Sequence, residues 1–250
     1  MRTMELLISE FQFLMVRLKG NTILAMIRVN ICGTGSDGNL SLIDDSLTAI
    51  MIDCGLSTKM IKDTSVFNRL KACIVTHQHN DHAKYKDKIS EITYIINDCT
   101  SKKIDNFRVT TVEAFHNVKN IAAYIYNEVE DISIMWATDY YKISKLYNEI
   151  DYIFSEISYD DDILNEALAN KSVEYMHYKG LLNHMSLQRF CNLLKNVNLN
   201  LLKGIVVLHE SNYLDRIIAI DKINEITKGR CSIYFGKGEY LLTKESITQK

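Results

Sequence analysis

The most distinctive stretch of the chain reads THQHNDH at residues 76–82, directly after the apolar run ACIV at residues 72–75. A short apolar run of this kind is typical of a buried strand. Four metal-ligating side chains stand just past its end: His77, His79, Asp81 and His82. Only seven histidines occur in 250 residues, and three of them lie here, so a metal site explains the stretch better than a polar surface turn. Imidazole and carboxylate without thiolate suit zinc, with manganese or iron as alternatives.

Three further candidate ligands stand singly, each directly after an apolar or strand-prone run. They are His116 after residues 109–115, Asp139 after residues 132–138 and His209 after residues 204–208. A lone histidine or aspartate after a strand is usually a cap or a hydrogen-bonded polar group. Taken in order with residues 76–82, however, the three form a coherent ligand set, because a strand end delivers each of them.

The pattern H-x-H-x-D-H resembles the signature of the metallo-β-lactamase superfamily, and the resemblance extends over about residues 26–235. It includes the glycine-rich loop at residues 33–39 and the turn Ile52-Asp53-Cys54-Gly55. Strands are predicted at residues 27–32, 40–43, 49–53, 72–76, 93–96, 107–112, 122–126, 132–138, 152–154, 204–208 and 232–235. Helices are predicted at residues 140–148, 161–169, 185–196 and 213–227. Paired strands followed by alternating strands and helices favour an α/β fold, an αββα sandwich of two mixed β-sheets with helices outside, which is the metallo-β-lactamase fold.

The resemblance implies two divalent metal ions, most simply Zn²⁺ with Mn²⁺ as the alternative. In the implied arrangement the first metal is held by His77, His79 and His116, the second by Asp81, His82 and His209, and Asp139 bridges the two. The best-known zinc β-lactamases place a cysteine near the position of Asp139, whereas an aspartate bridge looks like the phosphodiesterase and ribonuclease branches. Two cations roughly 3.5–4 Å apart generate a bridging hydroxide and clamp a phosphate between them.

The resemblance further implies catalytic roles for Asp81, His184 and Glu156. His184 opens a predicted helix and resembles the histidine that serves as general acid in tRNase Z-like enzymes, which are in the same superfamily. Glu156 would then orient the imidazole. The alternative is that His184 caps the helix and Glu156 is a surface carboxylate. His177 matches no motif and is interpreted as a partly buried structural histidine.

The substrate is less constrained than the metal centre. Related enzymes commonly follow the bridging aspartate with Thr-Gly, where this chain has Tyr140-Tyr141, and exonuclease-like members carry Asn-His-Asp, where it has Ser158-Tyr159-Asp160. The net charge is −2, so no basic track for a nucleic acid is apparent in the composition. Three lysines follow the ligand motif and either attract an anion to the metals or form a solvated helix face: Lys84, Lys86 and Lys88.

A compact core without an appended domain favours a small anionic nucleotide as substrate. In size it resembles the phage anti-Pycsar cyclic-nucleotide phosphodiesterases, which destroy a host antiviral signal. Tyr140, Tyr141 and Tyr159 are candidates to stack on the base. The alternatives are a tRNase Z-like or exonuclease-like nuclease acting on RNA or DNA, a hydrolase of carboxylic-acid derivatives or thioesters, and a metal-binding module without turnover. Homodimers are common among the proteins it resembles.

The remaining features describe the chain as a whole. Residues 1–25 are interpreted as a short N-terminal extension with an amphipathic helix, and residues 26–250 as one hydrolase domain. No stretch of about 18 apolar residues occurs, so we expect no membrane span and a cytoplasmic protein. The six cysteines show no C-x-x-C pair and are expected to be reduced.

Overall fold

The structure, a computed structural model, describes residues 26–61 and 63–250. The helix expected within residues 1–25 lies outside the described residues. In the part of the chain that is described, no helix is long and apolar enough to cross a lipid bilayer. All six cysteines are described, and all are free thiols.

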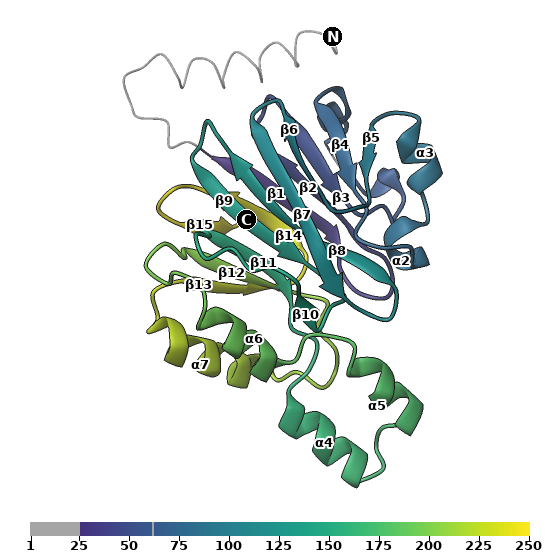
Figure 1. Cartoon of the computed structure of the whole chain (residues 1–250), viewed down its shortest axis with the longest axis vertical. Coiled ribbons are helices and arrows are strands. Elements are labelled where there is room, and N and C mark those ends of the chain that lie inside the picture. Colours follow the sequence, from purple (N-terminus) through teal and green to yellow (C-terminus); the bar gives the residue numbers. More distant parts are fainter. Residues whose placement is uncertain (1–25, 62) are drawn as a thin grey trace.

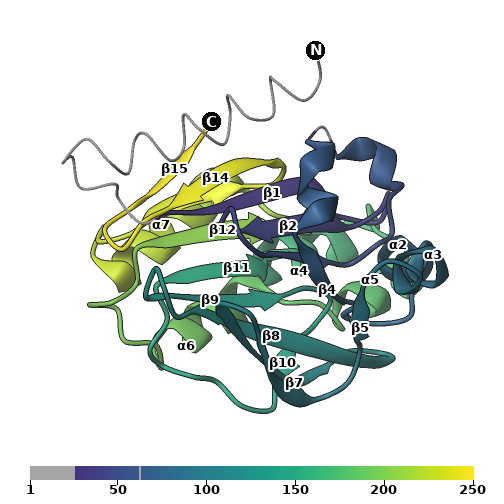
Figure 2. The same ribbon diagram turned by 90° about the horizontal axis from the view of Figure 1, so that it is seen from above.

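Two mixed β-sheets lie face to face (Figures 1 and 2). The first has the order β15 (Ile247–Gln249), β14 (Gly238–Leu242), β1 (Ile27–Gly33), β2 (Leu40–Asp44), β3 (Ala49–Ile52), β4 (Leu70–Ile74) and β5 (Tyr94–Ile96). The second has the order β10 (Lys142–Ile143), β7 (Phe107–Phe115), β8 (Lys119–Asn127), β9 (Ile132–Ala137), β11 (Tyr152–Glu156), β12 (Gly204–Leu208) and β13 (Ser232–Phe235), with β6 (Thr100–Ile104) also paired to β7. Each sheet contains antiparallel and parallel pairs, so both are mixed, as predicted.

The main core lies between the sheets and follows from the alternation of side chains along each strand. In β1 the buried positions are Ile27, Val29 and Ile31, which alternate with half-buried ones. From the second sheet, Trp136 stacks on Phe154 with ring centroids 5.0 Å apart and planes 8° apart. These side chains belong to one buried cluster, which joins the inner faces of the two sheets.

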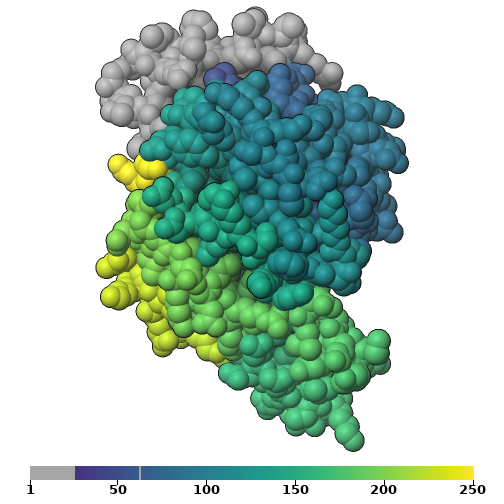
Figure 3. Space-filling view, in the orientation of Figure 1, coloured from purple at the N-terminus to yellow at the C-terminus, as the bar shows by residue number. Residues whose placement is uncertain are grey.

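Helices cover the outer faces of both sheets. They are α2 (Asn80–Ala83), α3 (Lys86–Ser90), α4 (Asp161–Ala169), α5 (Tyr175–Leu181), α6 (Leu187–Leu194) and α7 (Arg216–Thr227), with 3-10 turns at Thr58–Met60 and Thr64–Asn68. Phe190 of α6 and Ile223 of α7 pack on the second sheet, and Ile89 of α3 packs on the first. The α4–α5 pair extends away from the sandwich (Figures 1 and 3). The layer order αββα is therefore confirmed.

The helix predicted at residues 140–148 is wrong. The segment forms the short edge strand β10 and irregular chain, because its backbone N–H groups are used by the second sheet. Tyr140 donates its N–H to a carboxylate oxygen of Glu156, and Tyr141 and Ser144 donate theirs to carbonyl groups of β7. In a helix beginning at residue 140 the N–H of Ser144 would instead donate to the carbonyl of Tyr140.

Candidate metal centre

The candidate ligands meet at one edge of the sandwich, where strands end. β4, β7, β9 and β12 each end within three residues of a candidate: His77, His116, Asp139 and His209, respectively. Asp139 and His209 adopt left-handed backbone conformations, with φ of 51° and 49°. Residues other than glycine adopt this region infrequently, and clusters of them are typical of functional sites. The sharp turn redirects each side chain from the strand toward the shared edge.

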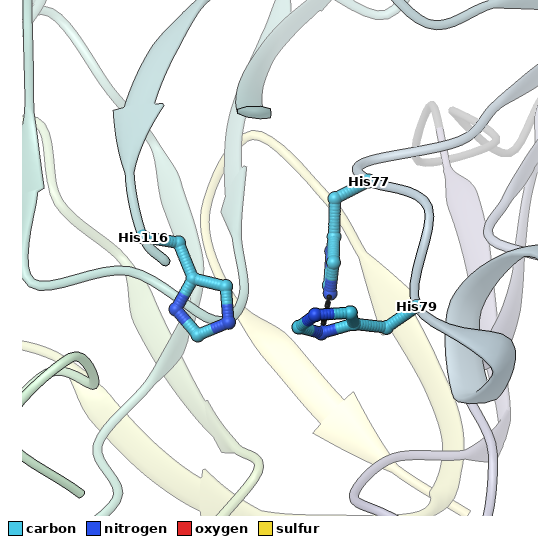
Figure 4. Close-up of side chains that lie close together, drawn as sticks. All are labelled: His77, His79 and His116. Atoms are coloured by element: carbon cyan, nitrogen blue, oxygen red, sulfur yellow. Dashed lines mark hydrogen bonds between the residues drawn. The ribbon is translucent and has the colours of Figure 1, made fainter. Parts of the chain in front are cut away.

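Three imidazoles converge from two segments, the loop after β4 and the end of β7 (Figure 4). Nε2 of His77 lies 3.0 Å from Nδ1 of His79. The ring centroid of His116 lies 5.4 Å from each of the other two centroids. Nδ1 of His116 donates to the carbonyl oxygen of Asn183 at 3.1 Å, which leaves its Nε2 as the ligating nitrogen. One ligand atom of each histidine lies within 4.8 Å of the others, so this group could hold a metal ion.

The protonation state of these imidazoles suits metal binding. Burial, followed by the nearby His82 ring, lowers the pKa of His77 to about 3. Burial also lowers the pKa of His116. Both rings are therefore neutral at pH 7, and the neutral imidazole is the form that binds a metal ion.

Asp81, His82, Asp139 and His209 form a second group with ligand atoms within 4.8 Å of one another. Nε2 of His82 lies 2.6 Å from Oδ2 of Asp139 and 3.3 Å from Oδ2 of Asp81. Burial lowers the pKa of His82, but the carboxylates of Asp53, Asp139 and Asp81 outweigh burial and hold that pKa well above its usual value. The carboxylates of Asp139 and Asp81 lie so close to Nε2 of His82 that a positive charge between them, either a proton or a metal cation, is favoured.

Two buried atoms of the second group fit a cation particularly well. Among the described residues, Oδ2 of Asp139 and Nε2 of His209 have no hydrogen-bond partner, although Asp139 keeps its ion-pair contact with His82. Buried polar atoms are nearly always paired with protein or water, so each atom needs an explanation. A carboxylate oxygen and an imidazole nitrogen are both ligands of zinc and manganese, so the donor set fits divalent metal ions.

Asp139 and His209 also belong to a third group, with Glu156 and His184. Nδ1 of His184 lies 2.6 Å from Oε1 of Glu156 and 3.2 Å from Oδ1 of Asp139. Glu156 is fully buried on β11, so the alternative of a surface carboxylate is wrong. The alternative of a capping His184 is wrong as well, because Ser186 is the N-cap of α6.

In this third group the histidines and the carboxylates shift one another's pKa values toward the charged forms. Burial lowers the pKa of His184, but the carboxylates of Glu156 and Asp139 outweigh it and raise the pKa to about 10. Burial raises the pKa of Glu156, yet the two adjacent imidazoles, His184 and His209, bring it below its usual value. At neutral pH the group therefore contains an ionised glutamate and a protonated His184, which has a proton to donate.

Asp53 is a residue of the candidate site that the sequence analysis passed over, because it appeared there only as part of a turn. Its Oδ2 accepts from Nδ1 of His82 at 2.7 Å, and its Oδ1 accepts from the N–H and the hydroxyl group of Thr76 at 2.8 and 2.9 Å. A carboxylate behind an imidazole fixes which nitrogen faces a metal. A signal was available: Asp53 follows the apolar strand β3 directly and has φ of 58°, as a strand-end ligand would.

The glycine-rich loop at residues 33–39 lies beside the candidate metal centre. Nδ2 of Asn39 lies 2.8 Å from Nε2 of His82, and the backbone N–H of Asn39 donates to the carbonyl oxygen of Asp81. Gly55 approaches the same carbonyl from the other side. A Cβ atom at Gly55 would stand 1.6 Å from that oxygen, so only glycine permits this approach.

Several expectations around the centre need correction. Tyr140 and Tyr159 are both 0% exposed, so neither can stack on a substrate base, whereas Tyr141 is 37% exposed. His177 is exposed on α5, not partly buried. Lys84 and Lys88 lie over the ring of Tyr85 at 5.6 and 5.9 Å, and this contact fits a solvated helix face as well as an anion-attracting one.

No protein-family model matches the sequence, and no curated protein matches it. Solved structures do match. The metallo-β-lactamase fold protein YhfI from Bacillus subtilis has a TM-score of 0.64 and 13% identity over 90% of this chain and 100% of its own. Unliganded yeast PDE1 has a TM-score of 0.60 and 11% identity over 88% of this chain and 100% of its own. The short form of human tRNase Z has a TM-score of 0.53 and 15% identity over 74% of this chain and 93% of its own. The chain therefore has the metallo-β-lactamase fold.

Proposed function

We propose that the chain is a dinuclear, metal-dependent phosphodiesterase that hydrolyses small or cyclic nucleotides. The observation that carries the proposal is the position of Asp139. Its Oδ2 faces His82, and its Oδ1 faces His184 and His209 at 3.2 and 3.3 Å. The same carboxylate is also close enough to His77 and His116 of the first group to oppose the lowering of the pKa of both rings, so it is suited to bridging two cations.

The proposed ligands follow the groups described above. His77, His79 and His116 would hold the first cation, Asp81, His82 and His209 would hold the second, and Asp139 would serve both. The donor chemistry favours Zn²⁺, with Mn²⁺ as the alternative. Bound there, two divalent cations lower the pKa of a shared water and neutralise the charge of a phosphate.

The chain itself supplies the proton for the leaving group. His184 carries a proton at neutral pH, and Glu156 holds its Nδ1 at 2.6 Å, so the orientation of the imidazole is fixed. Nε2 of the same ring is then the nitrogen that donates to a leaving alkoxide, which needs a proton to depart. Glu156 acts through His184 and is a positioning residue.

The phosphodiester class is supported by the chemistry and by the similar structures. Two cations offset the extra negative charge that a phosphate gains during attack. The structures similar to this one include a tRNase Z and yeast PDE1. A small substrate is favoured because the net charge is −2, and a polymer needs several matched cations. The alternative is a nuclease, to which the likeness to tRNase Z lends support.

The test is a measurement of metal content together with hydrolysis of bis-p-nitrophenyl phosphate and of cyclic mononucleotides. We expect two equivalents of divalent metal per chain and turnover that a chelator abolishes and added Zn²⁺ or Mn²⁺ restores. Metal-loaded protein that hydrolyses no phosphodiester would support the binding module without turnover. Hydrolysis of thioesters but of no phosphodiester would contradict the proposal and would assign the chain to another class of hydrolase.

A further inference from the structure

His184 lies in the link of five residues between α5 and α6. The side chain of His184 has few rotatable bonds, so the distance from its Nδ1 to Glu156 and Asp139 depends on the backbone of this link. Asn183 N and His184 N donate to carbonyl groups of α5 at 3.1 and 2.9 Å, which fixes the start of the link. Its carbonyl groups are fixed by other parts of the chain.

All four carbonyl oxygens of residues 182–185 accept a hydrogen bond. The donors are Nη1 of Arg189 to Leu182 at 3.0 Å, Nδ1 of His116 to Asn183 at 3.1 Å, Nη1 of Arg189 to His184 at 3.1 Å, and the N–H of Ser158 to Met185 at 2.8 Å. Nη1 of Arg189 therefore binds two of the four carbonyl groups, those of Leu182 and His184. The carbonyl group between them, that of Asn183, accepts from His116. Hydrogen bonds from a charged donor are stronger than those between neutral groups.

Arg189 is itself held in place. It belongs to the first turn of α6, is half-buried, and its guanidinium carbon lies 5.8 Å from the ring centroid of Tyr141. Stacking of this kind suits the planar guanidinium group of arginine better than the ammonium group of lysine. Tyr141 follows Asp139 by two residues, so Arg189 connects the segment that carries Asp139 with the link that carries His184.

We propose that Arg189 is the positioning residue that holds His184 in reach of Glu156 and of the leaving group. The inference rests on the proposed function, in which His184 protonates that group. In the described contacts the side chain of Arg189 donates two hydrogen bonds to the link and none to a side chain assigned to a metal. Its removal therefore displaces the acid directly and reaches the metal ligands only through the Asn183 carbonyl that accepts from His116. The consequence is specific: turnover falls most for substrates whose leaving group needs a proton.

Arg189→Ala is therefore compared with wild type on two substrates. We expect turnover of a cyclic mononucleotide to fall about 10–100-fold, the range for a misplaced catalytic group. Turnover of bis-p-nitrophenyl phosphate should fall by less than about threefold, because p-nitrophenolate leaves almost without a proton. Arg189→Lys keeps a cationic donor and should recover much of the loss. Arg230→Ala is the matched control, since Arg230 is exposed and, in the described contacts, its side chain bonds only to the side chain of Asn200.

Two further measurements separate positioning from a general structural role. The double variant His184→Ala/Arg189→Ala should turn over no more slowly than His184→Ala alone, because the two residues act through one proton transfer. Amide hydrogen exchange at residues 182–186 should become faster in Arg189→Ala at unchanged metal content and unchanged exchange in β11. Equal losses on the two substrates, additive losses in the double variant, or unchanged exchange at 182–186 would each overturn the proposal. If wild-type protein hydrolyses neither substrate, the proposed function fails instead, and the exchange measurement still decides whether Arg189 holds the link.

Discussion

His184 and Glu156 are 28 residues apart in the sequence, yet Nδ1 of one and Oε1 of the other meet at 2.6 Å. Glu156 is fully buried on β11, in the middle of the second sheet, whereas His184 lies in the link before α6. The rigid sheet therefore sets the direction of a side chain that comes from a connecting segment. Because His184 also lies 3.2 Å from Asp139, the proposed proton donor and a proposed metal ligand belong to one hydrogen-bonded network.

Replacing His184 with alanine should keep both metals and slow turnover by roughly 10²–10⁴-fold, the range for the loss of a general acid. The loss should be smaller for a p-nitrophenyl ester, which hardly needs protonation. Metal analysis and kcat on both substrates check this, with His177→Ala as the control, since His177 is exposed on α5. Disappearance of one metal equivalent would make His184 a ligand and would contradict the assignment of His209.

Replacing His79 or Asp139 with alanine should abolish turnover and leave the chain folded, because neither belongs to the apolar clusters of the core. The measurements are metal content, circular dichroism and hydrolysis of bis-p-nitrophenyl phosphate. His79→Ala should lose the metal held by the three histidines. Wild-type turnover in either variant would remove that residue from the metal centre.

Replacing Asp53 with alanine should weaken metal binding about 10–100-fold, as is typical when the partner of a ligating histidine is lost. Without the carboxylate, Nδ1 of His82 loses its charged acceptor at 2.7 Å and keeps only the hydroxyl group of Thr76 at 3.2 Å, so the ring is held less firmly against Asp139. Competition with a chromophoric chelator measures the affinity. Asp162→Ala is the control, since that side chain is 88% exposed. If Asp53→Ala and Asp162→Ala bind the metal with equal affinity, Asp53 contributes to folding and not to metal binding.

The metal-free protein should become less stable as pH rises. The folded-state pKa of His184 is about 10, above the value of about 6.5 for an unfolded chain, so the folded state binds the extra proton between these values. The stabilisation is complete below about pH 6.5 and is lost as pH approaches 10. Urea unfolding in the presence of a chelator measures the slope, and His184→Ala should make it shallower. A slope unchanged by this substitution would show that the His184–Glu156 pair contributes nothing to it.

Cyclic mononucleotides should be hydrolysed with a higher kcat/KM than single-stranded or transfer RNA. One phosphate can be neutralised by two cations, whereas a polymer presents a phosphate every few ångströms and needs a longer basic surface. The assay compares cyclic nucleotides, RNA and DNA at low and high salt. Efficient cleavage of RNA or DNA with a steep salt dependence, and no cleavage of cyclic nucleotides, would restore the nuclease alternative.

The sequence predicted the layers of the fold and singled out side chains that the structure brings together at one edge, because strand-end residues follow apolar runs that are easy to recognise. The helix at 161–169 is confirmed with the same bounds, since Asp160 caps it. The strands β6, β14 and β15 were missed. In β6 no residue is buried and two of the five are lysines, so no apolar run marks it. In β14 and β15 the buried residues are Tyr240, Leu242 and Ile247, and such short apolar stretches near the end of the sequence do not stand out.

The parts of the site that the sequence did not yield depend on contacts distant in the chain. Asp53 reaches His82 over 29 residues, and Arg189 was not noticed because its partners are backbone carbonyls, which leave no pattern. The burial of Tyr140 and Tyr159 was also not predictable from their neighbours. Ser155 accepts or donates a hydrogen bond with the hydroxyl group of Tyr140 at 2.7 Å, a partner that permits a tyrosine inside the core.

The left-handed backbone at Asp53, Asp139 and His209 has a consequence for engineering. Each of these residues holds a conformation that costs about 1 kcal/mol or more for a side chain with a Cβ atom and almost nothing for glycine. Asp53 and Asp139 offset that cost through their contacts with buried imidazoles, whereas Nε2 of His209 has no hydrogen-bond partner among the described residues. A library screened for heat resistance in the presence of a chelator should therefore enrich glycine at position 209 and collect robust but inactive proteins. The same library grown with Zn²⁺ would reverse that preference, so metal supply would determine which sequences survive selection.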